Sequence, residues 1–87
     1  MEITFQSKIA KQGDQRLIWI PKRFHDKIKD LDKTQFKTVI KNKKTKIKFV
    51  SMINKQGSNR VIIIPLFLKK DVKKIEADKS DIIIEKF

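Results

Sequence analysis

Residues 11–21 read KQGDQRLIWIP, and residues 55–65 read KQGSNRVIIIP, 44 positions further along the chain. In both copies a polar loop centred on Gly precedes a short apolar run that contains β-branched residues, and seven residues separate the Gly from a Pro. This pattern is typical of a strand, a tight loop and a second strand, followed by a helix with Pro at its first position. The two copies therefore predict one supersecondary unit that occurs twice.

The repeat extends over the whole chain. A shift of 44 aligns residues 1–43 with residues 45–87 without a gap, and 13 of the 43 aligned pairs are identical. Six further pairs exchange one apolar residue for another, as expected of an internal structural repeat. We therefore interpret residues 1–87 as a single domain made of two repeats, 1–43 and 45–87, with a tight polar turn at 41–46 between them.

Each repeat predicts the order ββαβ. The first strand alternates, with one face formed in the two copies by Ile3, Phe5, Ser7 and Ile9, and by Ile47, Phe49, Ser51 and Ile53. The second strands, 17–20 and 61–64, are apolar on both faces, which predicts burial from both sides. Third strands are expected at 36–41 and 81–87.

A short helix is expected after each Pro. Its apolar stripe would consist of Phe24, Ile28 and Leu31 in the first repeat, and of Leu68, Val72 and Ile75 in the second. The predicted fold is thus mainly β with two short helices. Neither half closes its own sheet, so we expect the two ββαβ repeats to interlock into one small β-barrel, because closure removes exposed edges.

The motif resembles the AbrB/MazE/SpoVT family of swapped-hairpin DNA-binding proteins, whose signature combines a Gly loop, an apolar strand and Ile-Pro-Lys. Residues 20–22 match the end of that signature, and Gly57-Ser58-Asn59-Arg60 resembles the loop of the MazE-like and archaeal branch. The resemblance implies a swapped-hairpin barrel in single-chain, pseudo-dimeric form, with the loops forming a basic cradle on DNA. Double-psi barrels are similar, and the sequence leaves both strand orders open.

Two features depart from the family pattern. Repeat two has Leu66 and Phe67 where a basic residue usually follows the Pro, and repeat one has His25 and Asp26 at the place of the basic pair on the early helix. The two apolar residues predict extra apolar surface. This surface fits either a homodimer contact or packing under a neighbouring loop.

Charge favours a polyanionic partner. The net charge is +12 at pH 7, with +7 in residues 1–44 and +5 in residues 45–87. Together with the resemblance, this predicts an AbrB-like transcriptional regulator that binds double-stranded DNA through two Gly-loop arms. The alternatives are an antitoxin-type toxin-binding module and a non-specific chromatin- or RNA-binding barrel.

The expected DNA contacts are basic and amide side chains. Arg16 and Arg60 hold equivalent positions, and a guanidinium fork suits phosphates or a guanine edge, although a solvated loop charge is the alternative. Amides suit base edges but are also common in turns. Asp14 in the first arm stands at the position that Ser58 holds in the second, and its negative charge would repel the DNA phosphates. We therefore expect the second arm to bind more strongly. The full set is Arg16, Arg60, Lys11, Lys55, Lys8, Gln12, Gln15, Gln56, Asn59, Lys22, Arg23, Lys69 and Lys70, with Asn54 as a further amide.

Two further features have ordinary structural interpretations. Trp19 stands in an apolar strand, which predicts core packing. The basic run from Lys37 to Lys48 fits either a second electrostatic patch or protection of a sheet edge by Lys.

Other function classes find little support. The chain has no Cys and a single His, so it offers no thiolate site, triad or cluster of metal ligands, and each Gly loop precedes a strand instead of a helix. We expect no enzyme activity, no cofactor and no metal. The apolar runs are too short to span a bilayer, and we expect a cytoplasmic, nucleoid-associated protein.

Overall fold

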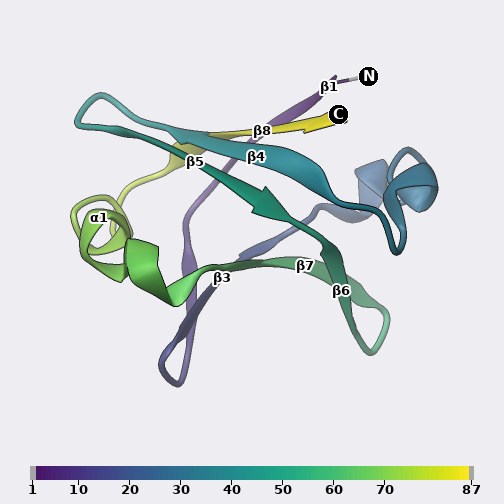
Figure 1. Ribbon diagram of the computed structural model, residues 1–87, viewed down its shortest axis with the longest axis horizontal. Helices are drawn as coiled ribbons and strands as arrows, with labels where there is room; N and C mark the ends of the chain where they lie inside the picture. Colours follow the sequence, from purple (N-terminus) through teal and green to yellow (C-terminus); the bar gives the residue numbers. More distant parts are fainter. Residues whose placement is uncertain (1, 87) are drawn as a thin grey trace.

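The computed structural model describes residues 2–86, which form a small, mainly β fold with two four-stranded antiparallel sheets and one short α-helix (Figure 1). Sheet A has the strand order β1-β8-β4-β5, and sheet B has the order β2-β3-β7-β6. The bounds are β1 (Glu2–Ser7), β2 (Ala10–Gln12), β3 (Gln15–Trp19), β4 (Phe36–Lys41), β5 (Lys46–Ser51), β6 (Ile53–Gln56), β7 (Asn59–Ile64) and β8 (Ser80–Lys86).

Strand pairing follows the repeat. β1 of the first repeat pairs with β8 of the second, and β5 of the second pairs with β4 of the first, in the same register 44 residues apart. At the centre of sheet B Ile18 lies opposite Ile62, and at the centre of sheet A Val39 lies opposite Ile83. Both pairs join equivalent positions, so a pseudo-twofold axis passes through both sheets. The prediction of a mainly β fold is confirmed, and the prediction of a closed barrel stays a prediction.

The core is shared between the repeats. Seventeen buried hydrophobic residues from both halves form one cluster, in which Ile18, Ile40, Ile62 and Ile82 are completely buried. The alternation predicted for the first strands is confirmed. Ile3 and Phe5 in β1, and Ile47 and Phe49 in β5, are buried and alternate with exposed residues. Burial of each large aliphatic side chain contributes about 1.5–3 kcal/mol. The two halves therefore stabilise each other through one shared core.

The strands agree closely with the prediction. The third strand of repeat one runs from Phe36 to Lys41 as expected, and that of repeat two begins one residue earlier than expected, while Phe87 lies outside the described residues. The turn at 41–46 is tight, because the amide of Asn42 donates to the carbonyl oxygen of Thr45 at 3.0 Å.

The Gly loops make the predicted hairpins. Gly13 and Gly57 both have φ of 61°, at the first position of a two-residue loop that joins antiparallel strands. A positive φ at this position is typical of a type II′ turn, where a side chain would strain the backbone.

The prediction of a helix in repeat one is wrong. Residues after Pro21 form two separate 3-10 turns, η1 (Lys22–Phe24) and η2 (Lys29–Leu31), while repeat two forms η3 (Leu66–Leu68) and α1 (Lys69–Lys73). His25 and Asp26 are poorer helix formers than Lys69 and Lys70 at the equivalent positions. No side chain caps any of these elements, so propensity decides between them. The stripe residues Ile28, Leu31, Val72 and Ile75 are buried all the same.

Candidate nucleic-acid interface

The two hairpins of sheet B, β2–β3 and β6–β7, carry most of the predicted site. Both hairpin turns lie at the lower edge of Figure 1, on the side away from sheet A, and their loop residues are exposed. Because β3 and β7 are antiparallel neighbours, the two turns leave opposite ends of the central strand pair. The result is two arms related by the pseudo-twofold axis.

One face of these arms is rich in amides. Cross-strand pairing and alternation place Gln12 and Gln15 on the same face as Leu17, and their equivalents Gln56 and Asn59 share that face. We call this the amide face; Asn54 also lies on it, opposite Val61. All of these amides except Gln56 are exposed, and Gln56 is partly so.

A hydrogen bond joins the arms across the amide face. Nε2 of Gln56 donates to Oε1 of Gln12 at 3.1 Å, and these two residues are 44 positions apart. They belong to β6 and β2, the two edge strands of sheet B. A side-chain contact between opposite edges requires a strongly curved sheet, so the amide face is concave.

Curvature explains the burial of the apolar centre. Leu17 and Val61 lie on the amide face, outside the main core cluster, yet neither is exposed. The predicted burial of both faces is confirmed at these positions. Trp19, on the same face, is 39% exposed, so its predicted role in the core is wrong. It pairs with Val61 at the end of β3.

The arginines point the other way. Arg16 alternates with Leu17 and lies on the core face, where it is 5% exposed and its Nε donates to Oε2 of Glu76 at 2.7 Å. Arg60 is half-buried, and its Nη1 donates to the carbonyl oxygen of Asn59 at 3.2 Å. Their role as DNA anchors stays a prediction, and Arg16 would have to leave Glu76 to perform it.

The predicted lysines fall in several places. Lys11 is exposed and lies opposite Arg16, while Lys55 lies opposite Arg60 and its Nζ is 3.0 Å from Oδ2 of Asp32. Lys8 is exposed in the bend between β1 and β2. The remaining predicted basic residues lie in the segments that follow each Pro: Lys22 and Arg23 in η1, and Lys69 and Lys70 in α1.

The outer face of sheet A divides by charge. The neighbouring strands β4 and β5 present Lys37, Lys41, Lys46 and Lys48, while β8 and β1 present Asp81, Glu85 and Glu2. Nζ of Lys37 lies 2.9 Å from Oε2 of Glu85, and this hydrogen bond lowers the pKa of the Glu85 carboxyl below its usual value. The basic run is therefore partly neutralised.

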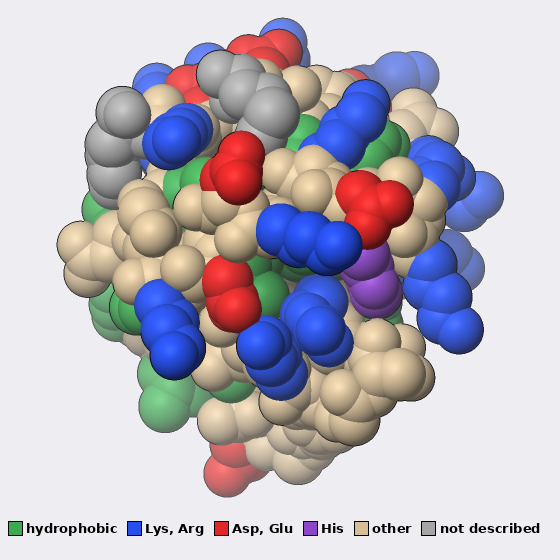
Figure 2. All heavy atoms as spheres, turned by 90° about the vertical axis from the view of Figure 1, so that its right-hand side faces the viewer, with side chains coloured by type: hydrophobic (Ala, Val, Ile, Leu, Met, Phe, Trp, Pro, Cys, Tyr) green, Lys and Arg blue, Asp and Glu red, His purple; other side chains and the backbone are tan. Residues whose placement is uncertain are grey.

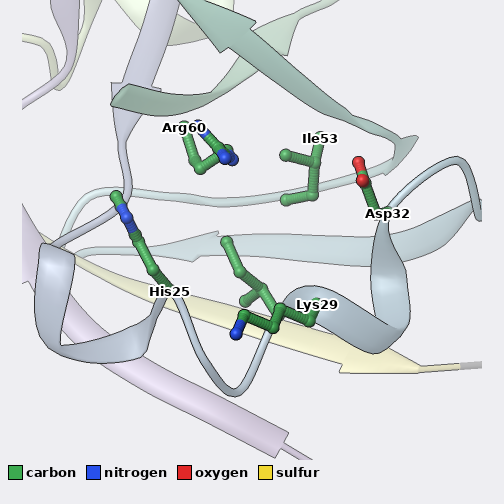
Figure 3. A pocket seen from close by; sticks show the side chains of 6 residues that line it. His25, Lys29, Asp32, Ile53 and Arg60 are labelled. Carbon is green, nitrogen blue, oxygen red and sulfur yellow. The ribbon is translucent and has the colours of Figure 1, made fainter. Parts of the chain in front are cut away.

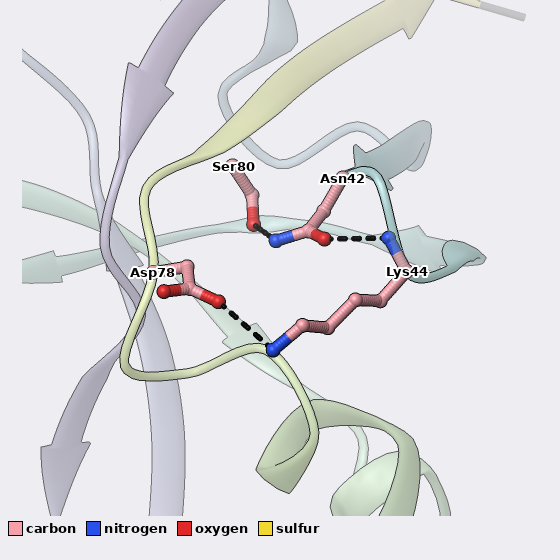
Figure 4. Close-up of polar contacts among 4 residues, drawn as sticks. All are labelled: Asn42, Lys44, Asp78 and Ser80. Carbon is pink, nitrogen blue, oxygen red and sulfur yellow. Dashed lines mark hydrogen bonds and ion pairs between the residues drawn. The ribbon is translucent and has the colours of Figure 1, made fainter.

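Lys44, in the turn between the repeats, is a second lysine of the basic run that pairs with a carboxylate. In Figure 4 Nζ of Lys44 approaches Oδ2 of Asp78 at 3.5 Å, and the Lys44 amide donates to Oδ1 of Asn42 at 2.8 Å. Nδ2 of Asn42 in turn donates to Oγ of Ser80 at 3.3 Å. These contacts fix the turn against the start of β8.

The apolar pair after Pro65 is exposed. Leu66 is 64% exposed and Phe67 is 81% exposed, and they border a shallow hollow with Lys69, Lys70 and Lys73. The alternative that they pack under a neighbouring loop is therefore wrong, while a partner contact stays a prediction.

Sequence reasoning missed two acidic partners, Glu76 and Asp32. They follow α1 and η2 at equivalent positions, so an acid recurs 44 residues apart just as Arg16 and Arg60 do. This parallel recurrence of opposite charges was the available signal.

Within residues 2–86 no group of three or more His, Asp or Glu side chains could hold a metal ion. None of the helices in this part of the chain has the length and hydropathy needed to cross a membrane. No protein family, curated protein or solved structure matches this chain.

Proposed function

We propose that the protein binds double-stranded DNA through the amide face, as a single-chain, AbrB-like regulator whose interleaved repeats form a swapped-hairpin barrel. The observation that carries this proposal is the presence of two pseudo-symmetric amide pairs, Gln12 with Gln15 and Gln56 with Asn59, on one concave surface. Gln and Asn can form two hydrogen bonds with the edge of adenine in the major groove. A twofold protein surface also suits the local twofold symmetry of duplex DNA.

Charge supports the same partner. The net charge of +12 attracts a polyanion, and phosphate neutralisation supplies much of the affinity of such complexes. The amide face has no basic residue on its strands, so phosphate contacts fall to basic residues outside that face. We assign these contacts to Lys8, Lys11, Lys22, Arg23, Lys69 and Lys70, and we assign base reading to the amides.

The barrel in this proposal rests on the cross-repeat pairing of β1 with β8 and of β5 with β4. In such a fold each repeat lends its first strand to the sheet of the other.

The decisive experiment is a selection of bound duplexes from a random pool, followed by fluorescence anisotropy with the selected sequence. The double variant Gln15→Ala/Asn59→Ala should lose about 1–3 kcal/mol for each contact to a base on the selected duplex and much less on an unrelated duplex. Gln6→Ala, an exposed amide on sheet A, is the matched control and should bind as the wild type does. Equal binding by the double variant and the wild type would refute the amide face as the reading surface.

A non-specific nucleic-acid binder is the second candidate, favoured by the lysines that β4 and β5 present on sheet A. In that case RNA and unrelated duplex would compete as well as the selected duplex. Substitution of Lys46 and Lys48 by Gln would then weaken binding more than the amide variant does.

Leu66 and Phe67 support the proposal of a homodimer contact, because large apolar side chains are seldom left this exposed in a contiguous pair. Sedimentation of the wild type and of Leu66→Lys/Phe67→Arg tests it. We expect a concentration-dependent dimer only in the wild type, and two monomers would refute the contact.

A further inference from the structure

The two arginine sites differ in what surrounds the guanidinium. Arg16 is bound by Glu76, and the equivalent residues 44 positions away are Arg60 and Asp32. Asp32 is one methylene shorter than Glu76, and its Oδ2 lies 3.0 Å from Nζ of Lys55. Among the described residues no carboxylate forms an ion pair with Arg60. The Glu76 carboxylate therefore lies beside the Arg16 guanidinium, whereas no described carboxylate takes the equivalent place beside Arg60.

A cavity lies at this place. It has a volume of about 90 Å³ and is lined by His25, Ile28, Lys29, Asp32, Ile53 and Arg60 (Figure 3). In Figure 3 Arg60 and His25 lie on one side, and the Asp32 carboxylate lies beyond Ile53 from Arg60. Ile28 is 3% exposed and Ile53 packs against the core, so the cavity wall includes apolar surface. An ion pair formed beside such surface is less screened by water than one in solution.

Positive charge exceeds negative charge around the cavity. Within residues 2–86 Lys29 pairs only with Asp26, at 3.2 Å, and both side chains are largely exposed, so this contact is weak and readily exchanged. The ring nitrogen Nε2 of His25 lies 3.1 Å from the carbonyl oxygen of Ile20, which only accepts hydrogen bonds, so Nε2 carries a proton. Figure 2 shows several Lys and Arg side chains around this His on the molecular surface.

We infer that this cavity binds a small oxyanion, such as a carboxylate or phosphate group, whose oxygens take the position that Glu76 holds at Arg16. A guanidinium pairs with such groups through two parallel hydrogen bonds. Lys29 supplies a second cation, and Asp32 is kept away by Lys55. This inference does not depend on the proposed reading of bases, which uses the opposite face of sheet B.

The test titrates the full chain with inorganic phosphate at constant ionic strength and follows backbone and arginine side-chain NMR signals. Saturable shifts are expected at Arg60, His25 and Lys29, with none at Arg16. The Asp32→Glu variant restores the missing methylene, should place a carboxylate on Arg60, and should weaken phosphate binding about tenfold or more. Arg60→Gln should weaken it similarly.

Lys27→Gln is the matched control, since it removes one exposed charge from the same segment but outside the cavity lining. It should leave phosphate binding within about twofold of the wild type. An NMR spectrum with the dispersion of the wild type would show that each variant is folded. Equal weakening by Lys27→Gln, or no effect of Asp32→Glu, would overturn the inference.

A further titration identifies the source of the oxyanion. If the cavity receives a phosphate of nucleic acid, duplex DNA should compete with inorganic phosphate, and Asp32→Glu should flatten the log-affinity against log-salt slope for DNA by about 0.9. If the ligand is a free anion, duplex DNA should leave the phosphate titration unchanged. Both results support an oxyanion site. Because the first titration contains no DNA, its failure is distinct from a failure of DNA binding.

Discussion

The two hairpins of sheet B share their length, turn and register, yet their arginines lie in different surroundings. Arg16 is buried and bound to Glu76 at 2.7 Å, whereas Arg60 is half-buried and borders a cavity. The acidic residues at the equivalent positions, Glu76 and Asp32, differ by one methylene. The comparison shows that two repeats in one chain can differ at a matched position, with a structural ion pair at one arginine and, among the described residues, none at the other.

Sheet A shows a second divergence. β4 presents Lys37 and Lys41, and β8 presents Asp81 and Glu85 at the equivalent positions, so opposite charges face each other across the pairing of β4 with β8. In a dimer of identical repeats Lys37 would face Lys41 of the other copy. Opposite charges across strands stabilise a sheet and like charges destabilise it. The charges therefore favour pairing of unlike repeats.

The largest effect expected at the two arginine sites comes from Glu76→Ala. It leaves a buried guanidinium without its partner, and we expect a loss of about 2–3 kcal/mol in the free energy of unfolding, at the lower end for a buried pair because Glu76 is 31% exposed. Urea denaturation measures this loss. The matched variant Asp32→Ala breaks only the partly exposed contact with Lys55 and should cost less than about 1 kcal/mol. Equal losses in the two variants would show that the arginine sites are energetically alike.

Shortening the acid should convert one site into the other. Glu76→Asp copies the arrangement of the second hairpin, and we expect a loss of about 1 kcal/mol because the charge stays near Arg16 while the hydrogen bond is lengthened or lost. Phosphate titration should then show a second set of shifts, at Arg16. Stability equal to that of the wild type, without new shifts, would mean that the methylene does not decide the difference.

The sequence predicts the strands well and the ion pairs poorly, for a physical reason. Alternation and β-branched runs are local signals, so Phe36–Lys41 and the Gly hairpins are found where expected. The contact between Arg16 and Glu76 spans 60 residues and depends on how the repeats pair. Only the parallel recurrence of acid and arginine hints at it.

Two errors have local causes. The helix expected after Pro21 does not form, because His25 and Asp26 have lower helix propensity than Lys69 and Lys70 at the equivalent positions. Both faces of its strand are apolar, which predicts a core position for Trp19, but the curvature of sheet B covers Leu17 and leaves Trp19 exposed. Sheet curvature is a property of the assembled fold and is not encoded in the pattern of one strand.

Trp19→Ile, which introduces the residue of repeat two, should change the free energy of unfolding by no more than about 0.5 kcal/mol, because Trp19 is 39% exposed. Urea denaturation followed by circular dichroism avoids dependence on the lost fluorophore. Leu17→Ala, on the same face but completely buried, is the control and should cost about 2–5 kcal/mol. A comparable loss in Trp19→Ile would restore the core interpretation.

The smallest expected effect concerns the charges that distinguish β4 from β8. The hydrogen bond from Lys37 lowers the pKa of Glu85 below its ordinary value of 4.5. A carboxyl whose pKa is lower in the folded state stabilises the fold above its unfolded pKa, and this contribution disappears as the pH falls through the folded pKa. Wild type should therefore exceed Lys37→Met in stability at pH 7, and the gap should narrow below pH 4.5. The side chains of Lys37 and Glu85 are 39% and 34% exposed, so this difference in stability should also shrink in high salt.

Urea denaturation at several pH values measures the difference in stability between the wild type and Lys37→Met. Lys43→Met is the control, because Lys43 is outside any described ion pair. A gap that stays constant down to acidic pH would show that Lys37 acts through packing instead of charge.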